Sequence, residues 1–377
     1  MANLQLSLQT DGESTFPSSL TPPVTPIAKE SGPISFKNTK TEQSPSKENA
    51  QTLSFTDDIE ICRDSDNRSV ELGRGVWSIV YKARSVPAQT ALGTPPTSPV
   101  TAPQVLAVKA PLRRDARPVL KAEAITLTRL AYIPGHEHHI VPYHGFHAEL
   151  CALILSAIPL SLSTYIEDQS DLARKRQPAT PTMFDPVQGP ASYQDLARKL
   201  ISGLNWLHDT AGVVHGDIKP QNILLWAIDD DREHEFPYQP LFIDFSATVD
   251  IPQDANAPLD TTRASMSSFT PPFTAPEMLA SLTCSEMAPT PASDVFSLAA
   301  TLLAAATGDL LLYSNMNHRL RLEMARAGHQ IIDFTRSGVN GNRVPRNGFV
   351  ERIVKPAVVK DPVMRISTAD WVKLASA

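Results

Sequence analysis

The sequence predicts an α+β fold in two lobes, the first rich in strands and the second rich in helices. In the first part, up to about residue 158, short apolar runs bounded by turn residues are typical of β-strands. Beyond Val213 the strands are short, and most apolar residues recur at helical spacing. The 377 residues leave room for one large domain or two small ones, because domains usually hold about 100–200 residues.

Charge and cysteine content narrow the class of protein. The chain has 34 basic and 40 acidic residues, a formal net charge of −6, and 42% hydrophobic residues. We therefore expect a globular protein without a nucleic-acid partner, because no net basic field could hold a phosphate backbone. Cys62, Cys151 and Cys284 are odd in number and far apart, so they predict no disulfide framework and suit a reducing compartment.

Targeting signals are not evident. The first ten residues combine neither a basic start nor an apolar core, so we expect no secretion signal. The apolar stretch from Val295 to Tyr313 is interrupted by Gly308 and Asp309, which favours a buried helix over a membrane span. We expect an intracellular protein, in the cytoplasm or nucleus, that is neither secreted nor membrane-spanning.

Proline marks the predicted boundaries. The chain has 33 prolines and 16 glycines, whereas average usage would give about 19 and about 26. Residues 1–54 combine proline with Ser, Thr, Gln and Lys, which predicts a disordered tail. Two further proline-rich stretches predict inserts at 84–103 and 169–190 in an ordered domain that covers 55–377.

The ordered elements follow one another along this domain. A strand, a glycine turn and a second strand are expected over 69–83, and a short apolar strand over 104–110. Helical spacing predicts a helix over 119–130, followed by a buried strand over 150–158. Residues 193–208 predict an amphipathic helix whose leucines share one face.

The glycine turn is the first candidate binding feature. Gly73 and Gly75 would let backbone N–H groups approach a polyphosphate, and Val80 would then cover a base or sugar. Ser78 stands where a third glycine would be expected in such a loop. By itself the pattern favours an ordinary glycine-turned hairpin.

A lysine ends the next apolar strand. Lys109 in this place is costly without an anionic partner, and Glu123 on the following helix could supply one, together with phosphate oxygens. The alternative is a surface lysine whose stem covers apolar side chains.

The segment from His215 to Asn222 carries the strongest signal. Asp217 can accept a hydroxyl proton, Lys219 can face a transferring phosphoryl group, and Asn222 can bind a hard metal ion. Asp244 ends the apolar strand Leu241-Phe242-Ile243 and could complete a Mg²⁺ site with Asn222.

In this order, these residues resemble a eukaryotic protein kinase from about Phe55 to the C-terminus. The resemblance implies a bilobal protein-kinase-like fold, with a small β-rich N-lobe over about 55–156 and a larger helical C-lobe over about 157–377. It implies ATP as substrate, with Lys109 on the α/β-phosphates and Glu123 as its ion-pair partner. Asp217 would be the base, Lys219 would stabilise the γ-phosphoryl, and Asn222 and Asp244 would hold Mg²⁺.

The resemblance extends to adenine and to a peptide substrate. It places Leu155 near the gatekeeper, and Ser156 to Ile158 at the hinge that contacts adenine. It also assigns Ala107 and Leu224 to nucleotide binding. Thr270 to Glu277 resembles the peptide-docking segment that ends in Ala-Pro-Glu. Asp294 resembles the start of the central buried helix, and Arg365 the partner of Glu277.

Three positions depart from the family pattern. Gly216 replaces the arginine that grips a phosphorylated activation loop, which suggests activity that is not gated by loop phosphorylation. Ser246 replaces the glycine after Asp244-Phe245 and would stiffen the metal-binding loop. Ser78 replaces a loop glycine, which is a mild change.

We expect a kinase that transfers the γ-phosphoryl of Mg-ATP to Ser or Thr hydroxyls of a protein; nothing in the pattern assigns an oligomeric state. A nucleotide-binding pseudokinase scaffold is one alternative. A small-molecule phosphotransferase resembling aminoglycoside and choline kinases is another, since those enzymes share the His-Gly-Asp pattern. Lys219 and the segment Ala275-Pro276-Glu277 favour the protein substrate.

Overall fold

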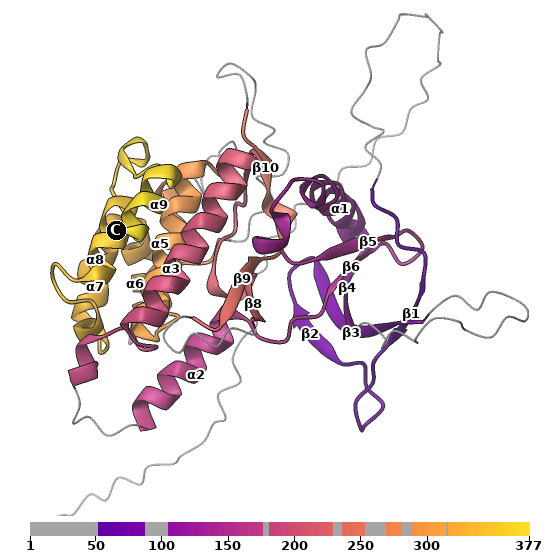
Figure 1. Ribbon diagram of the computed structural model, residues 1–377, viewed down its shortest axis with the longest axis horizontal. Coiled ribbons are helices and arrows are strands. Elements are labelled where there is room, and N and C mark those ends of the chain that lie inside the picture. Colours follow the sequence, from indigo (N-terminus) through magenta and orange to yellow (C-terminus); the bar gives the residue numbers. More distant parts are fainter. Residues whose placement is uncertain are drawn as a thin grey trace, which may run out of the picture. The chain divides into compact units, whose positions relative to one another are not determined.

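An antiparallel sheet and the helix α1 (Arg117–Ala131) make up the N-terminal lobe (Figure 1). The computed structural model describes residues 52–86, 105–175, 181–228, 236–252, 269–280, 288–313 and 316–377, all within one compact unit. The strands are β1 (Asp58–Ile61), β2 (Glu71–Arg74), β3 (Ser78–Val86), β4 (Val105–Pro111), β5 (Tyr143–His147) and β6 (Ala152–Ser156). Their order is β1-β3-β4-β6-β5, with β2 paired to β3.

The register of this sheet places the candidate nucleotide residues side by side. Val80 on β3 faces Lys109 on β4, and Gly73 on β2 faces Val80. On the other side of β4, Ala107 faces Leu155 on β6. β4 is the buried strand between β3 and β6, and this explains its continuous apolar run.

The C-terminal lobe is mainly helical. Its helices are α2 (Leu162–Lys175), α3 (Pro190–Asn205), α4 (Pro276–Ala280), α5 (Pro291–Thr307), α6 (His318–Arg326), α7 (Ile331–Ser337), α8 (Phe349–Val354) and α9 (Thr368–Ser376). Two strand pairs, β7 (Val213–Val214) with β10 (Val249–Asp250) and β8 (Ile223–Ala227) with β9 (Tyr238–Phe242), complete it. The predicted α+β fold in two lobes is thus confirmed.

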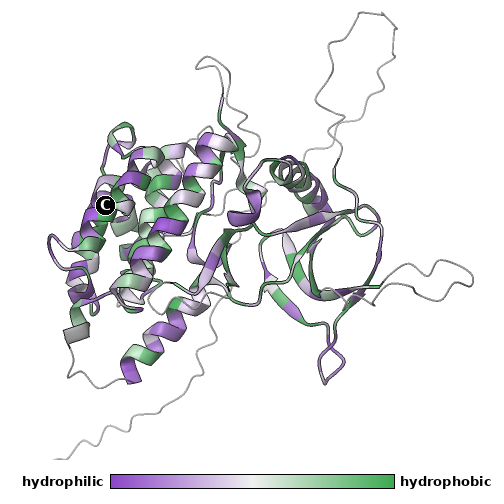
Figure 2. Cartoon of the chain, in the orientation of Figure 1, coloured by the Kyte–Doolittle hydropathy of each residue, from purple (hydrophilic) through white to green (hydrophobic). Residues whose placement is uncertain are grey.

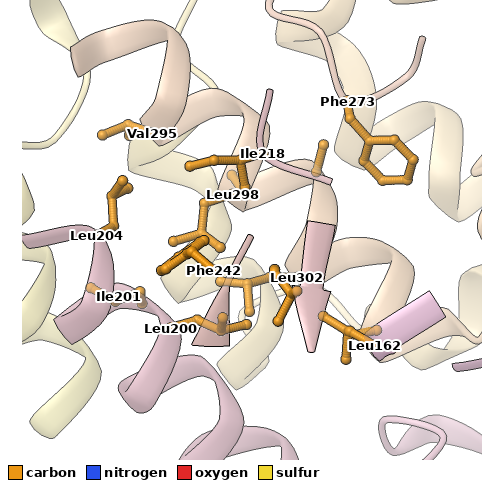
Figure 3. Close-up of a cluster of buried hydrophobic side chains, with 14 of the residues drawn as sticks. Leu162, Leu200, Ile201, Leu204, Ile218, Phe242, Phe273, Val295, Leu298 and Leu302 are labelled. Atoms are coloured by element: carbon orange, nitrogen blue, oxygen red, sulfur yellow. The ribbon is translucent and has the colours of Figure 1, made fainter. Parts of the chain in front are cut away.

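Amphipathic helices surround a core that lies beneath the β8–β9 pair. Figure 2 shows hydrophilic and hydrophobic stripes along α2 and α3. The apolar stripe of α3 contributes Leu200, Ile201 and Leu204, which lie beside Phe242 and Leu298 in the core (Figure 3). Ile218 belongs to the same core, so the loop that carries Asp217 is anchored by its own apolar side chain.

α5 is the central helix of this core. Every residue from Ser293 to Thr307 is buried, and the Thr290 hydroxyl caps its first turn in a capping box with Ser293. The helix ends at Gly308, whose φ of 74° is left-handed. The predicted buried helix is therefore confirmed. None of the helices in the described residues has the length and apolar composition that a bilayer span requires.

Several predicted elements have different bounds. The strand expected over 150–158 is the shorter β6, and the helix expected over 119–130 is the longer α1. The helix expected over 193–208 starts at Pro190, and a π-helical turn, Trp206–Thr210, follows it. The described part of the N-terminal lobe contains two further strands, β1 and β5, for which no element was expected.

The predicted tail and inserts also need correction. Leu53 and Ser54 were assigned to a disordered tail over 1–54, but both contact β5 and belong to the ordered unit. Residues 84–86 of the first predicted insert end β3, and residues 169–175 of the second end α2. A short 3₁₀-helix, Pro181–Phe184, lies in the second insert as well. Residues 1–51, 87–104 and 176–180 lie outside the described part of the chain, as does Cys284; Cys62 and Cys151 are free thiols.

Candidate active site

The amine of Lys109 is the centre of the first charged cluster. It donates to both carboxylate oxygens of Glu123 at 2.8 Å and to Oδ1 of Asp244, also at 2.8 Å. β4 supplies the lysine, α1 supplies the glutamate, and the end of β9 leads to the aspartate. The Phe245 amide donates to Glu123 Oε1 at 3.1 Å, so the helix and the Asp244 loop are joined through the backbone as well.

Burial and charge act in opposite directions on the three pKa values. Burial raises the pKa of Glu123 above its usual range, although Lys109 opposes this. Burial would also raise the pKa of Asp244, but Lys109 and the Ser246 hydroxyl lower it well below its usual range. Burial disfavours the charged form of Lys109, yet its two carboxylate partners raise its pKa. The lysine therefore stays cationic and has a partner, which excludes the alternative of a surface lysine.

The catalytic-loop candidates form a second cluster. Lys219 Nζ donates to Oδ2 of Asp217 at 2.7 Å, and Asn222 Nδ2 donates to the same oxygen at 2.9 Å. Asn222 Nδ2 also donates to the Asp217 carbonyl at 2.8 Å. Both donors approach one oxygen, which fixes the carboxylate and leaves Oδ1 without a donor among the described residues. That oxygen can accept a proton.

Asp217 is the carboxyl group in this cluster with a pKa close to neutrality. Burial raises the pKa of Asp217 to about 6, although Lys219 and Asn222 lower it in part. A general base is most effective when its pKa lies near the working pH, so this environment suits proton transfer from a hydroxyl.

The two clusters meet along the β8–β9 pair. The Ile243 amide donates to the Asn222 carbonyl at 3.0 Å, so Asn222 and Asp244 lie on adjacent backbone segments. Asp244 also raises the pKa of Asp217 by its charge. The five residues expected to act on phosphate, metal and hydroxyl are therefore brought together.

Asp294, at the start of α5, binds the backbone of the catalytic loop. Its carboxylate accepts from the amides of His215 and Gly216, at 2.7 and 3.0 Å, and from His208 at 3.1 Å. The sequence indicated Asp294 only as a helix start. The capping pattern beside Asp294 predicts where α5 begins. It does not reveal these partners, because they lie 78 or more positions away in the sequence.

Gly216 allows close contact between the catalytic loop and the Asp244 loop. Its φ of 83° is left-handed, and an added Cβ would lie 2.6 Å from the carbonyl oxygen of Ala247. Only glycine fits without displacing one of the two loops. The departure noted at this position in the sequence is thus a packing requirement of the structure.

The residues proposed for metal binding have free oxygens of the right kind. Lys109 and the Ser246 hydroxyl both bind Oδ1 of Asp244, the latter at 2.8 Å. The side-chain amide nitrogen of Asn222 donates to Asp217. Oδ2 of Asp244 and Oδ1 of Asn222 therefore have no donor among the described residues. One carboxylate and one amide oxygen fit Mg²⁺, which takes few protein ligands and completes its shell with phosphate and water.

The expected adenine contacts line the hinge between the lobes. Ile158 packs in a small apolar cluster with Val141 and Leu241, against which Leu155 and Leu224 also pack. Ala107 is next to Leu155 in the sheet register, and Ser156 follows Leu155 on β6. The sequence positions assigned to adenine are thus neighbours in space.

The glycine turn is closed by a hydrogen bond from the Gly75 amide to the Ser78 carbonyl at 2.8 Å. Nothing in the described residues lies within 4 Å of a Cβ built on Gly73. Both glycines connect to Lys109 through β3, and no hydrogen bond within the described residues joins them to Asp217 or Asp244. Within the described residues, their link to the site is the sheet register.

Lys219 and Arg365 bind the segment from Thr270 to Glu277. Lys219 Nζ donates to the Thr270 hydroxyl at 3.3 Å. Arg365 Nη1 and Nη2 donate to the two oxygens of Glu277, each at 2.7 Å, as expected from the resemblance. Arg365 also donates to the carbonyls of Ala292 and Val359, at 2.8 and 3.1 Å. The Arg365 bonds fix Glu277 to the first turn of α5 and to the segment between α8 and α9.

Comparison with known proteins agrees with this geometry. The profile of the protein kinase domain matches residues 165–373, more than half of the chain. Serine/threonine-protein kinase PknK from Mycobacterium tuberculosis is 28% identical over 185 residues, which are 48% of this chain and 14% of PknK. PknK from Mycobacterium bovis matches to the same extent. Human ribosomal protein S6 kinase alpha-4 is 38% identical over 86 residues, which are 22% of this chain and 10% of that protein.

The matched regions are thus a small part of each relative. The domain match contains the whole Asp217 cluster, Asp244 and the Glu277–Arg365 pair. Together with the two-lobed fold and the joined charged clusters, it leaves one assignment. The chain belongs to the protein kinase family.

Proposed function

We propose that the chain is a protein serine/threonine kinase that uses Mg-ATP. The observation that carries the proposal is the convergence of Lys109, Asp217 and Asp244 on one site between the lobes. A cation for phosphates, a base near neutral pKa and a metal-binding carboxylate are the groups that phosphoryl transfer needs.

In the proposed reaction, Asp217 orients the acceptor hydroxyl and accepts its proton. The hydroxyl oxygen then forms a bond to the γ-phosphorus while the bond from that phosphorus to the oxygen of ADP breaks. Lys109 binds the α/β-phosphates, and Lys219 faces the charge on the γ-phosphoryl group. Asn222 and Asp244 would hold Mg²⁺, which neutralises phosphate charge when bound.

The remaining assignments concern nucleotide orientation. The Gly73–Gly75 turn and Val80 would cover the phosphates and base, and Ala107 and Leu224 would enclose adenine from above and below. Ser156 and Ile158 would offer hinge backbone groups; the Ile158 amide has no acceptor among the described residues.

Selectivity for Ser and Thr is supported by the contact between Lys219 and Thr270, which join the catalytic loop to the segment before Glu277. The similarity to PknK, which is named a serine/threonine-protein kinase, supports it as well. Protein rather than small-molecule substrates are supported by the fixed Ala275-Pro276-Glu277 segment, since the Glu277–Arg365 pair holds it in place.

Transfer of radiolabelled phosphate from Mg-ATP to an array of Ser, Thr and Tyr peptides tests the proposal. Wild type should label Ser and Thr peptides, and Asp217→Asn, which keeps the side-chain volume, should lose the signal. Asp168→Asn, at an exposed position on α2, is the matched control and should retain activity.

Three outcomes would contradict the proposal. Full activity of Asp217→Asn would mean that Asp217 is not the base. A thermal shift with Mg-ATP but no transfer above the mutant level would indicate a nucleotide-binding scaffold. Transfer to an amino-alcohol and to no peptide would indicate a small-molecule phosphotransferase.

A further inference from the structure

We propose that residues 52–55, which we call the strap, position α1 and thereby keep Glu123 within reach of Lys109. The strap precedes β1 and runs beside β5 and α1 (Figure 1). The proposal rests on the proposed function, because it concerns how the same site holds its nucleotide. Residues of the strap touch no reacting atom, so their role is one of positioning.

The strap pairs with the free edge of the sheet. β5 is the last strand in the order β1-β3-β4-β6-β5, so within the described residues one of its edges pairs with no other strand of the sheet. Phe146 on β5 donates its amide to the Leu53 carbonyl at 2.7 Å, and the Phe55 amide donates to the Phe146 carbonyl at 3.1 Å. Ser54 and Phe146 thus form a parallel bridge, which fixes the strap to the sheet.

The same segment is bonded to the helix that carries Glu123. The Leu53 amide donates to the hydroxyl of Thr128 on α1 at 2.9 Å, across 75 positions of sequence. That hydroxyl is buried and donates to the Ala124 carbonyl at 2.7 Å. The Thr128 hydroxyl has only one proton, which it donates to the Ala124 carbonyl of its own helix. It therefore acts as the acceptor for the Leu53 amide of the strap.

Gly145 makes the close approach possible. Its φ is 140°, and a Cβ built on it would lie 3.0 Å from the Leu53 carbonyl oxygen and 3.0 Å from the Phe55 nitrogen. A glycine in a strand interior weakens the strand unless another backbone comes close, and here the strap does so.

The side chains of the strap reach two different apolar clusters. Leu53 packs against the main core, to which Ala124 and Leu127 of α1 contribute. Phe55 packs against a separate cluster that contains Leu106 and Val108 of β4. The strap is therefore hydrogen-bonded to the helix of Glu123 and packs, through Phe55, against a cluster that includes residues from the strand of Lys109.

This connection matters because the Lys109–Glu123 pair depends on short distances. Both oxygens of Glu123 lie 2.8 Å from the lysine amine. A displacement of α1 by about 1 Å would carry them beyond hydrogen-bonding range. Lys109 would then be free to turn toward Asp244 alone, and the nucleotide phosphates would lose an oriented cation.

Two full-length variants, Thr128→Val and Thr128→Ser, test the strap. Valine keeps the shape of threonine and removes the acceptor, whereas serine keeps the hydroxyl. Thr128→Val removes both the bond from the Leu53 amide and the bond to the Ala124 carbonyl. We expect it to raise the hydrogen-exchange rates of the α1 amides by at least about fivefold, the effect of about 1 kcal/mol from a single lost hydrogen bond. The same variant should raise KM for ATP and lower kcat at 25 °C, and Thr128→Ser should match wild type.

Ser54→Ala is the control, because Ser54 is exposed and contributes to the bridge through its backbone. Gly145→Ala is the second test, since its added methyl group pushes the strap away from β5; it should shift exchange and KM for ATP in the same direction. Thr128→Val and Gly145→Ala test the strap independently, so the proposal can be judged even if one of the two variants folds poorly.

Equal α1 exchange rates and equal KM values for Thr128→Val and Thr128→Ser would overturn the proposal. A drop in melting temperature without a change in KM for ATP would also overturn it, since that result describes a purely structural contact. If wild type transfers no phosphate, the proposed function fails. The strap is then judged by hydrogen exchange and by the thermal shift with Mg-ATP.

Discussion

The α-carbon of Gly216 faces the carbonyl oxygen of Ala247 so closely that a methyl group on the glycine would lie 2.6 Å from this oxygen. Gly216 precedes Asp217, and Ala247 belongs to the turn that follows Asp244. The proposed base and a proposed metal ligand are therefore placed relative to each other by a contact that permits no side chain.

Gly216→Ala should abolish transfer, and Gly216→Arg should do the same instead of restoring the arginine common in the family. In each variant the new Cβ collides with the Ala247 carbonyl, and the substituted residue must also keep a left-handed φ. That backbone conformation by itself costs about 1–2 kcal/mol. Phosphate transfer and melting temperature measure the effect. Gly212→Ala separates the two causes, because Gly212 has a φ of +66° but nothing within 4 Å of its added Cβ. Retained activity in Gly216→Ala would show that the loops can move apart.

The pH dependence of kcat/KM should report Asp217. Burial raises the pKa of its carboxyl group to about 6, and only the ionised form can accept a proton. Activity should therefore rise with pH by about tenfold per unit below pH 6 and level off above it. A pH-rate profile with the best peptide of the array measures this limb. A profile that stays flat from pH 5 to about pH 7 would assign the proton to another acceptor.

Ser246→Ala should weaken metal binding. The hydroxyl of Ser246 donates to Oδ1 of Asp244, and its loss lets the carboxylate rotate, so that Oδ2 is no longer fixed. One hydrogen bond to a charged group is worth about 1.5 kcal/mol, so the Mg²⁺ concentration that half-saturates the thermal shift with ATP should rise about tenfold. Ser246→Thr keeps the hydroxyl and should behave like wild type. Identical Mg²⁺ titrations for the alanine and threonine variants would refute this role.

Arg365→Ala should destabilise the C-terminal lobe by about 3–5 kcal/mol, because it leaves Glu277 without its buried partner. Arg365→Lys keeps the charge but cannot make both bonds to Glu277 and those to Ala292 and Val359. We expect it to cost about 2 kcal/mol. Urea denaturation gives the free energy of unfolding for both. A loss below about 1 kcal/mol in the alanine variant would mean that the pair contributes little.

The sequence predicted those parts of the site that depend on local pattern. Lys109 ends an apolar strand, and Asp217, Lys219 and Asn222 share one short loop, so spacing alone brings their chemistry together. Glu123 was the anionic candidate on the following helix, and the resemblance implied it and Arg365 as ion-pair partners. Both ion pairs are present in the structure.

Contacts between residues far apart in the sequence could not be predicted from local pattern. Asp294 binds two amides of the catalytic loop, and nothing near Asp294 in the sequence encodes that distance. Leu53 was assigned to a tail because the composition around it is rich in Pro, Ser and Thr, although its own amide and side chain belong to the fold. Gly216 and Ser246 were recognised as departures from the family pattern, but no physical reason for them was evident in the sequence. In the structure Gly216 lies against the Ala247 carbonyl, and Ser246 donates to the Asp244 carboxylate.

The contact of Asp294 with the catalytic loop also has a consequence during synthesis. His215 leaves the ribosome 79 residues before Asp294, which is about 4–16 s at ordinary elongation rates. During this interval the amides of His215 and Gly216 lack the Asp294 carboxylate, because α5 has not yet been synthesised. A nascent chain therefore cannot hold Asp217 in its final geometry, and a translational pause between these residues would prolong that interval.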